Sequence, residues 1–122
     1  MFKGIQAVFY FVSDVVAAAK WYSELLAIPV TNYFESDGKI RGASIQIGDV
    51  EMFLHLADAK MQPGHTGQVA YWRVDHINHA IEQAQQHGAR LYRGPLQIEN
   101  NQAICQMWDI FGNLFGMQGN YS

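Results

Sequence analysis

The sequence predicts a small α+β protein, a single domain over residues 1–122, built from two β-α-β-β-β repeats. Three observations predict this fold class: an internal repeat at constant spacing, two amphipathic helical segments, and turn residues that divide the remainder into short strands. We expect the first repeat at about residues 1–57, a linker at 58–66 and the second repeat at about 67–119. One such unit cannot cover both faces of its sheet. We therefore expect two concave mixed sheets with the helices on their outer faces and a ligand-sized concavity between them.

The repeat is visible in two strand-like segments that both begin with glutamine. Residues 6–12 and 68–74 each continue with β-branched, small or aromatic residues, which favour strands. At the same offset Val15 meets Ile77, and each of these residues opens a helical pattern. Each strand is therefore expected to lead through a short connection into a helix.

Both helices are predicted from apolar residues that recur with a period of 3.6. In the first half these residues are Val15, Ala18, Trp21, Tyr22 and Leu25. In the second half they are Ile77, Ala80, Ile81 and Ala84. Pro29 prevents continuation of the first helix, and Gly88 stands where a helix commonly ends in a left-handed turn. Asn78 is the expected N-cap of the second helix.

Three further strands are expected after each helix. In the first half they fall at about 30–36, 39–47 and 50–57, and in the second half at about 89–98, 102–109 and 113–119. Glycine with aspartate or asparagine in a short loop is a strong hairpin signal, and such loops separate most of these strands. Pro63 and Gly64 mark the linker between the halves.

The composition favours an oligomer or an aromatic-lined pocket. Hydrophobic residues make up 49% of the chain, aromatic residues 13% and charged residues only 16%. This is more apolar surface than one small monomer comfortably hides. We expect a homodimer.

Charge, cysteine content and hydropathy exclude several classes of partner. The net charge is −3 without a run of Lys or Arg, so nucleic acid is not expected as a partner. The single cysteine, Cys105, excludes an internal disulfide and a multi-cysteine zinc site, and its place within a strand indicates a packing residue. The chain starts without a signal-peptide pattern, and no apolar run approaches the roughly 20 residues of a membrane span. We expect a cytoplasmic protein with no membrane partner.

Three stretches in register resemble the glyoxalase/bleomycin-resistance/dioxygenase superfamily, also called vicinal oxygen chelate. The first runs from Phe11 to Asp14 and continues to the Trp21-Tyr22 pair. The second runs from Arg73 to Asp75 and continues to Gly88. The third is the turn at 109–113, with Ile110 where proline is usual. The resemblance implies the paired-repeat fold. It does not select a function, because the superfamily includes lyases, dioxygenases, epimerases, thiol transferases and non-catalytic drug-binding proteins.

The resemblance also places four metal-ligand positions, on the first and last strands of each half. The residues at these positions are Ala7, Val69, Phe53 and Gly116. None can coordinate a divalent ion, which needs three or four oxygen or imidazole ligands, so we expect neither a metal nor another cofactor. The assignment of Phe53 depends on the register of the strand at 50–57. A slip of two residues would bring Glu51 or His55 to the ligand position.

Alternation along the strands predicts which side chains line the concavity. The residues expected to contact a ligand are Phe9, Phe11, Phe53, His55, Tyr71, Arg73 and Trp108. Flat aromatic walls suit a planar ligand, and Arg73 suits a carboxylate or phosphate. Either Trp108 or its neighbour Met107 reaches the concavity, and alternation does not decide which. The alternative interpretation is that the aromatic residues are sheet-to-sheet core.

These residues favour a metal-independent protein that binds a planar, partly aromatic small molecule, neutral or anionic. The first alternative is a lyase or dioxygenase-like enzyme with a displaced metal site, or a cofactor-independent catalyst in which His55 or Glu51 acts as the base. The second alternative is an interaction module without a ligand. His65, in the linker, has no support from the sequence as a ligand-binding residue.

Overall fold

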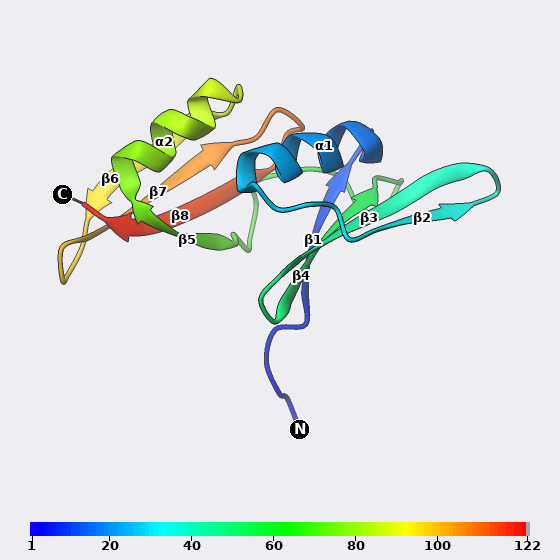
Figure 1. Cartoon of the computed structure of the whole chain (residues 1–122), viewed down its shortest axis with the longest axis horizontal. Helices are drawn as coiled ribbons and strands as arrows, with labels where there is room; N and C mark the ends of the chain where they lie inside the picture. Colours follow the sequence, from blue (N-terminus) through cyan, green and yellow to red (C-terminus); the bar gives the residue numbers. More distant parts are fainter. Residues whose placement is uncertain (122) are drawn as a thin grey trace. The chain divides into compact units, whose positions relative to one another are not determined.

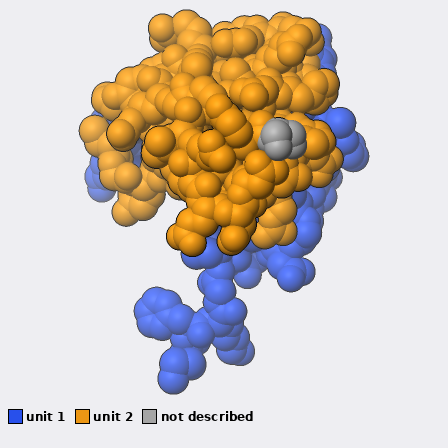
Figure 2. Space-filling model, turned by 90° about the vertical axis from the view of Figure 1, so that its left-hand side faces the viewer, with its two compact units in different colours: residues 1–63 blue, residues 64–122 orange. Residues whose placement is uncertain are grey.

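The structure is a computed structural model that describes residues 1–121. The chain divides into two compact units, residues 1–63 and the residues from 64 onward, shown by colour in Figure 2. The boundary lies within the segment 58–66. Each unit carries one helix and four strands, drawn in chain order in Figure 1.

In the first unit, one strand and one helix precede a three-stranded meander. The elements are β1 (Ala7–Val12), α1 (Val15–Leu26), β2 (Asn32–Ser36), β3 (Lys39–Ile47) and β4 (Val50–Leu56). The strand order in the sheet is β1-β4-β3-β2, with β1 parallel to β4 and the other pairs antiparallel.

The second unit repeats this topology. Its elements are β5 (Tyr71–His76), α2 (Ile77–Gln86), β6 (Arg90–Gln97), β7 (Gln102–Trp108) and β8 (Leu114–Asn120). The strand order is β5-β8-β7-β6, again with one parallel pair, β5 with β8. The predicted fold class of two β-α-β-β-β repeats with mixed sheets is confirmed.

Each helix packs on one face of the sheet of its own unit. In the first unit, α1 contacts β3 and β4. The buried apolar residues of β1, β3 and β4 recur at every second position, which places one apolar face under the helix. They are Tyr10, Val12, Ala43, Ile45, Met52 and Leu54. The rings of Tyr10 and Tyr22 meet edge to face at 5.4 Å. The opposite face of this sheet is left without a covering element from its own unit.

The two helices begin differently. Asp14 caps α1, because its side chain accepts a hydrogen bond from the Ala17 amide at 3.0 Å. His76 occupies the same place before α2 and makes no side-chain cap bond. The expectation that Asn78 caps α2 is therefore wrong. The strand β5 runs directly into the helix, so Asn78 already lies in the first helical turn. At the other end Gly88 has φ +97°, as the sequence predicts.

The predicted hairpin loops form, and two strands begin later than expected. Asp37 and Gly38 have φ of 54° and 74°, which is the conformation that a two-residue hairpin loop of this type requires. The strand expected from residue 30 begins at Asn32. The strand expected from residue 68 begins at Tyr71, although the carbonyl of Ala70 already accepts a hydrogen bond from the Gly116 amide at 2.8 Å.

The turn at residues 109–113 has a structural explanation for its polar residues. The Asp109 carboxylate is buried and accepts hydrogen bonds from the amides of Phe111 and Asn113, both at 2.8 Å. The Asn113 side chain in turn accepts from the Gly64 amide at 3.1 Å. This turn therefore ties the start of the second unit to β8.

Candidate ligand-binding site

The register of β1 with β4 places the predicted ligand-contacting residues of the first unit on one face. Ala7 pairs with Glu51, Phe9 with Phe53, and Phe11 with His55. Paired residues on neighbouring strands point to the same side of a sheet, here the side away from α1. In this register Glu51 lies directly across from Ala7, and Phe53 lies across from Phe9.

Aromatic rings crowd this face of the first unit. Phe9 and Phe53 stack with ring centroids 4.8 Å apart, and Phe11 lies 5.3 Å from the His55 ring. Phe34, on β2, lies 5.4 Å from Phe53. Phe9 is 50% exposed in the chain, so the face is not a closed core within its unit.

Phe34 is a site residue that sequence reasoning missed. It pairs with Gly42 across the hairpin of β2 and β3. The Phe53 ring lies directly over that glycine, where an added Cβ would stand only 2.5 Å from the ring carbon Cζ. A regular two-residue hairpin would pair Phe34 with Arg41, and a register shift between Phe34 and Glu35 moves it opposite Gly42, so the sequence offered no local signal for this contact.

The two catalytic candidates do not converge. Glu51 and His55 share a face but lie four residues apart on β4, which separates them by about 13 Å along the strand. The Nδ1 atom of His55 lies 2.8 Å from the Leu56 carbonyl oxygen. Because a carbonyl only accepts, Nδ1 carries the proton in this contact, and Nε2 of the neutral ring is left as an acceptor. His55 can thus accept a proton by itself but not together with Glu51.

In the second unit Tyr71 is the central residue of the equivalent face. It pairs with Gly116 across β5 and β8, and its ring lies over that glycine. A Cβ at residue 116 would stand 2.5 Å from Cδ2 of Tyr71, so only glycine leaves room for the ring. Gln106 donates a hydrogen bond from Nε2 to the Tyr71 hydroxyl oxygen at 2.9 Å. The Tyr71 ring therefore packs on Gly116, and Gln106 holds its hydroxyl group in place.

Two hollows border Tyr71 on this unit. The first, of about 460 Å³, is mostly polar and is lined by Tyr71, Trp72, Arg73, Val74, Asp75, Gln102, Gln118 and Asn120. The second, of about 360 Å³, is mostly apolar and is lined by Tyr71, Arg93, Gly94, Pro95, Leu96, Ile104, Cys105 and Gln106. Both volumes lie within the range of small-molecule pockets. Arg73, a predicted contact residue, thus lies beside Tyr71.

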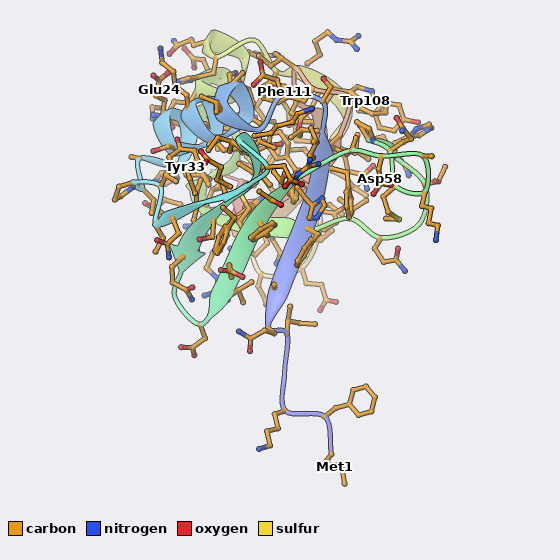
Figure 3. The ribbon with its side chains drawn as sticks, turned by 90° about the vertical axis from the view of Figure 1, so that its right-hand side faces the viewer. Met1, Glu24, Tyr33, Asp58, Trp108 and Phe111 are labelled. Atoms are coloured by element: carbon orange, nitrogen blue, oxygen red, sulfur yellow. The ribbon has the colours of Figure 1, made fainter. Side chains whose placement is uncertain are left out.

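The structure decides between Trp108 and Met107. Met107 is fully buried, whereas Trp108 lies on the opposite face of β7 and is partly exposed. The Trp108 ring, labelled in Figure 3, meets His65 at 5.0 Å and Tyr92 at 5.4 Å, both edge to face. His65 and Tyr92 were not predicted as neighbours of the site. Neither carries a local sequence signal, because the contact joins the linker to two strands.

The residues of the first and last strands do not fit the metal site that the fold implies. Ala7, Val69 and Gly116 have no ligating side-chain atom, and Phe53, which the resemblance assigns to the fourth position, offers only a phenyl ring stacked on Phe9. Within residues 1–121, no group of three His, Cys, Asp or Glu side chains gathers closely enough to hold a metal ion. The chain's own donors therefore do not reproduce a divalent-ion site.

Cys105 lies in the wall of the apolar hollow but is not a reactive thiol. Its side chain is 2% exposed, and burial raises its pKa from the usual 9.0 to about 11. A thiol with this pKa is protonated near neutral pH and is a poor nucleophile. Its place in the site agrees with the packing role that the sequence predicts.

The comparison with protein families identifies the class of this chain. Residues 4–117 match the model of the Glyoxalase/Bleomycin resistance protein/Dioxygenase superfamily, and the chain therefore belongs to that superfamily. No curated protein matches the sequence significantly. No helix in the described part of the chain is both long and apolar enough to span a membrane.

Solved structures with the same fold are numerous and distant in sequence. The antibiotic binding protein TnmS3 from a Streptomyces species superposes with a TM-score of 0.75 at 18% identity, covering 98% of this chain and 97% of that one. A superfamily member from Sphaerobacter thermophilus gives 0.77 at 18% identity, covering 97% and 98%. The fosfomycin resistance protein FosX from Listeria monocytogenes gives 0.75 at 10% identity, covering 98% and 94%. At these identities the likeness establishes the fold alone.

Proposed function

We propose that this chain is a metal-independent binding protein for a planar, partly aromatic small molecule. The observation that carries the proposal is aromatic surface at positions that the resemblance to the superfamily assigns to metal ligands. In the first unit the Phe53 ring stacks on Phe9 at a ligand position, and in the second the Tyr71 ring lies over Gly116 at another. Exposed, flat rings bind planar compounds by stacking, and within residues 1–121 no cluster of His, Cys, Asp or Glu side chains offers a metal site.

The relatives offer a parallel for such binding. TnmS3 is described as an antibiotic binding protein and FosX as a fosfomycin resistance protein, so proteins of this fold bind or act on small molecules. By analogy, sequestration of a small molecule is the behaviour we propose here. The other function classes considered are an enzyme that uses His55 or Glu51 and an interaction module without a ligand.

Elemental analysis separates the binding protein from a metalloenzyme. Protein purified without added metal is expected to contain far less than one equivalent of any divalent ion, and ligand binding should be unchanged by a chelator. A stoichiometric ion that disappears in Glu51→Gln or His55→Ala would overturn the proposal.

A matched pair on β2 tests whether the aromatic face binds the ligand. Phe34 and Tyr33 are exposed to 45% and 48%, but they point to opposite faces of the same strand. Planar aromatic compounds that quench intrinsic fluorescence should bind more weakly to Phe34→Ala and equally well to Tyr33→Ala. A screen in which the unmodified protein binds no compound would favour the interaction module.

Assembly and location are part of the proposal. We expect a homodimer, supported by exposed apolar side chains such as Phe9, Leu96 and Ile110. A monomeric mass by light scattering at micromolar concentration would count against it. The one cysteine, buried and unpaired, is compatible with the reducing cytoplasm in which we place the protein.

A further inference from the structure

We infer that the apolar hollow of the second unit binds an aromatic anion, with the ring against Tyr71 and the negative group at Arg93. This inference rests on the proposed function and names its ligand class more narrowly. It also moves the anionic contact from Arg73, which the sequence predicts, to a residue that sequence reasoning did not select.

The hollow exists because β6 departs from regular pairing. The register of β6 with β7 shifts between Leu91 and Arg93 and again between Arg93 and Leu96. Such irregularities change the direction in which the side chains of the strand point. Here they bring Arg93, Pro95 and Leu96 to the border of one groove, whose other side is formed by residues of β7.

The charges around the two hollows differ. Arg93 is the only charged residue among those lining the apolar hollow, whereas the polar hollow contains both Arg73 and Asp75. Within residues 1–121 the Arg93 side chain forms no ion pair or hydrogen bond, so its guanidinium donors are available. A single guanidinium beside an apolar wall suits a ligand with one negative group on an aromatic body. Asp75 disfavours an anion in the polar hollow.

The Tyr71 ring provides the flat surface for that body. It lines the same groove as Leu96, and the hydrogen bond from Gln106 limits its movement. Because the Gln106 amide is already committed to Tyr71, the amide is less available to the ligand. Polar recognition is then left mainly to Arg93. The chemical class is an aromatic carboxylate, sulfonate or phenolate with an otherwise apolar ring system.

Two fluorescent probes that share one ring system test the inference. Anilinonaphthalene sulfonate carries a negative group, and N-phenylnaphthylamine is its uncharged counterpart. We expect Arg93→Gln to weaken binding of the sulfonate by about tenfold and to leave the neutral probe within about twofold, since only the charged contact is removed. Added salt should reduce the sulfonate's advantage in the unmodified protein. Leu96→Ala should weaken both probes by the same factor.

Arg73→Gln is the matched control, because it removes the same charge from the neighbouring hollow. The inference holds if Arg93→Gln alone lowers the affinity ratio of sulfonate to neutral probe. It is overturned if Arg93→Gln leaves that ratio unchanged, or if Arg73→Gln produces the loss instead. If neither probe binds the unmodified protein, the proposed function fails as well, and the two failures are thereby distinguished. Circular dichroism confirms that each variant is folded.

Discussion

Replacing Gly116 with alanine probes how tightly the Tyr71 ring is held against the sheet. An added Cβ would stand 2.5 Å from the ring, and ordinary carbon contacts need about 3.5 Å. The ring must therefore move by roughly 1 Å, which breaks or weakens the 2.9 Å hydrogen bond from Gln106. Loss of that bond costs about 1 kcal/mol, within the usual range of about 0.5–1.5 kcal/mol.

A second effect has the opposite sign. Glycine within a strand is less stable than alanine by about 0.5–1 kcal/mol, because glycine loses more backbone entropy on folding. With Tyr71 present the two effects roughly cancel, and Gly116→Ala should change the free energy of unfolding by less than about 1 kcal/mol. In a Tyr71→Ala background the clash is absent. Gly116→Ala should then stabilise the protein by about 0.5–1 kcal/mol.

Urea unfolding of the four proteins in this double-mutant cycle measures the coupling, which we expect near 1 kcal/mol. Gly64→Ala provides the control, because a Cβ at Gly64 meets nothing within 4 Å. Its effect should add to that of Tyr71→Ala within about 0.5 kcal/mol. A coupling below about 0.5 kcal/mol between Gly116 and Tyr71 would refute the reasoning, since it would mean that the Tyr71 ring does not rest on the glycine.

Four further substitutions test local features of the fold. Asp14→Ala should lower the free energy of unfolding by about 1 kcal/mol through loss of the N-cap bond. His76→Asp should raise it by a similar amount, because it supplies the cap that α2 lacks. Melting curves of either variant that match the unmodified protein would contradict the corresponding prediction. Ala27 ends α1 at φ 56°, so Ala27→Gly should stabilise by about 0.5–1 kcal/mol in the same denaturation assay, and a loss would refute this. The Cys105 pKa is raised to about 11 in the fold, so its contribution to stability is complete below pH 9 and is lost as pH rises toward 11. Cys105→Ala should flatten that part of the pH–stability curve, and an unchanged slope would be inconsistent with the raised pKa.

Local signals in the chain predicted the elements well. The loop at Asp37 and Gly38 forms where the residue types demand it, because those residues adopt positive φ at low cost. The internal repeat predicted that both halves share one order of elements along the chain, which they do. The second helix begins at Ile77, where the pattern opens, but its cap was mispredicted, since the N-cap position falls on His76, the last residue of β5, and Asn78 lies within the helix.

The site was predicted less completely than the fold. Phe9 and Phe53 were assigned to one face from alternation, and their pairing confirms that placement. Arg93 and Tyr92 were not selected, because β6 is irregular and its side chains do not follow a simple alternation. Strand bulges depend on how two strands pair, and no local residue pattern encodes the shift.

The sequence by itself determined the chemistry available at the metal positions. Ala7, Val69 and Gly116 lack ligating atoms in any conformation, and this property belongs to the residue type alone. Only the tertiary structure decided that Phe53 lies on Gly42 and that Tyr71 lies on Gly116. The Tyr71–Gly116 contact joins β5 to β8, which lie far apart in the chain. The Phe53–Gly42 contact joins the antiparallel strands β4 and β3. Their geometry follows from hydrogen-bond register, which is set when the sheet assembles.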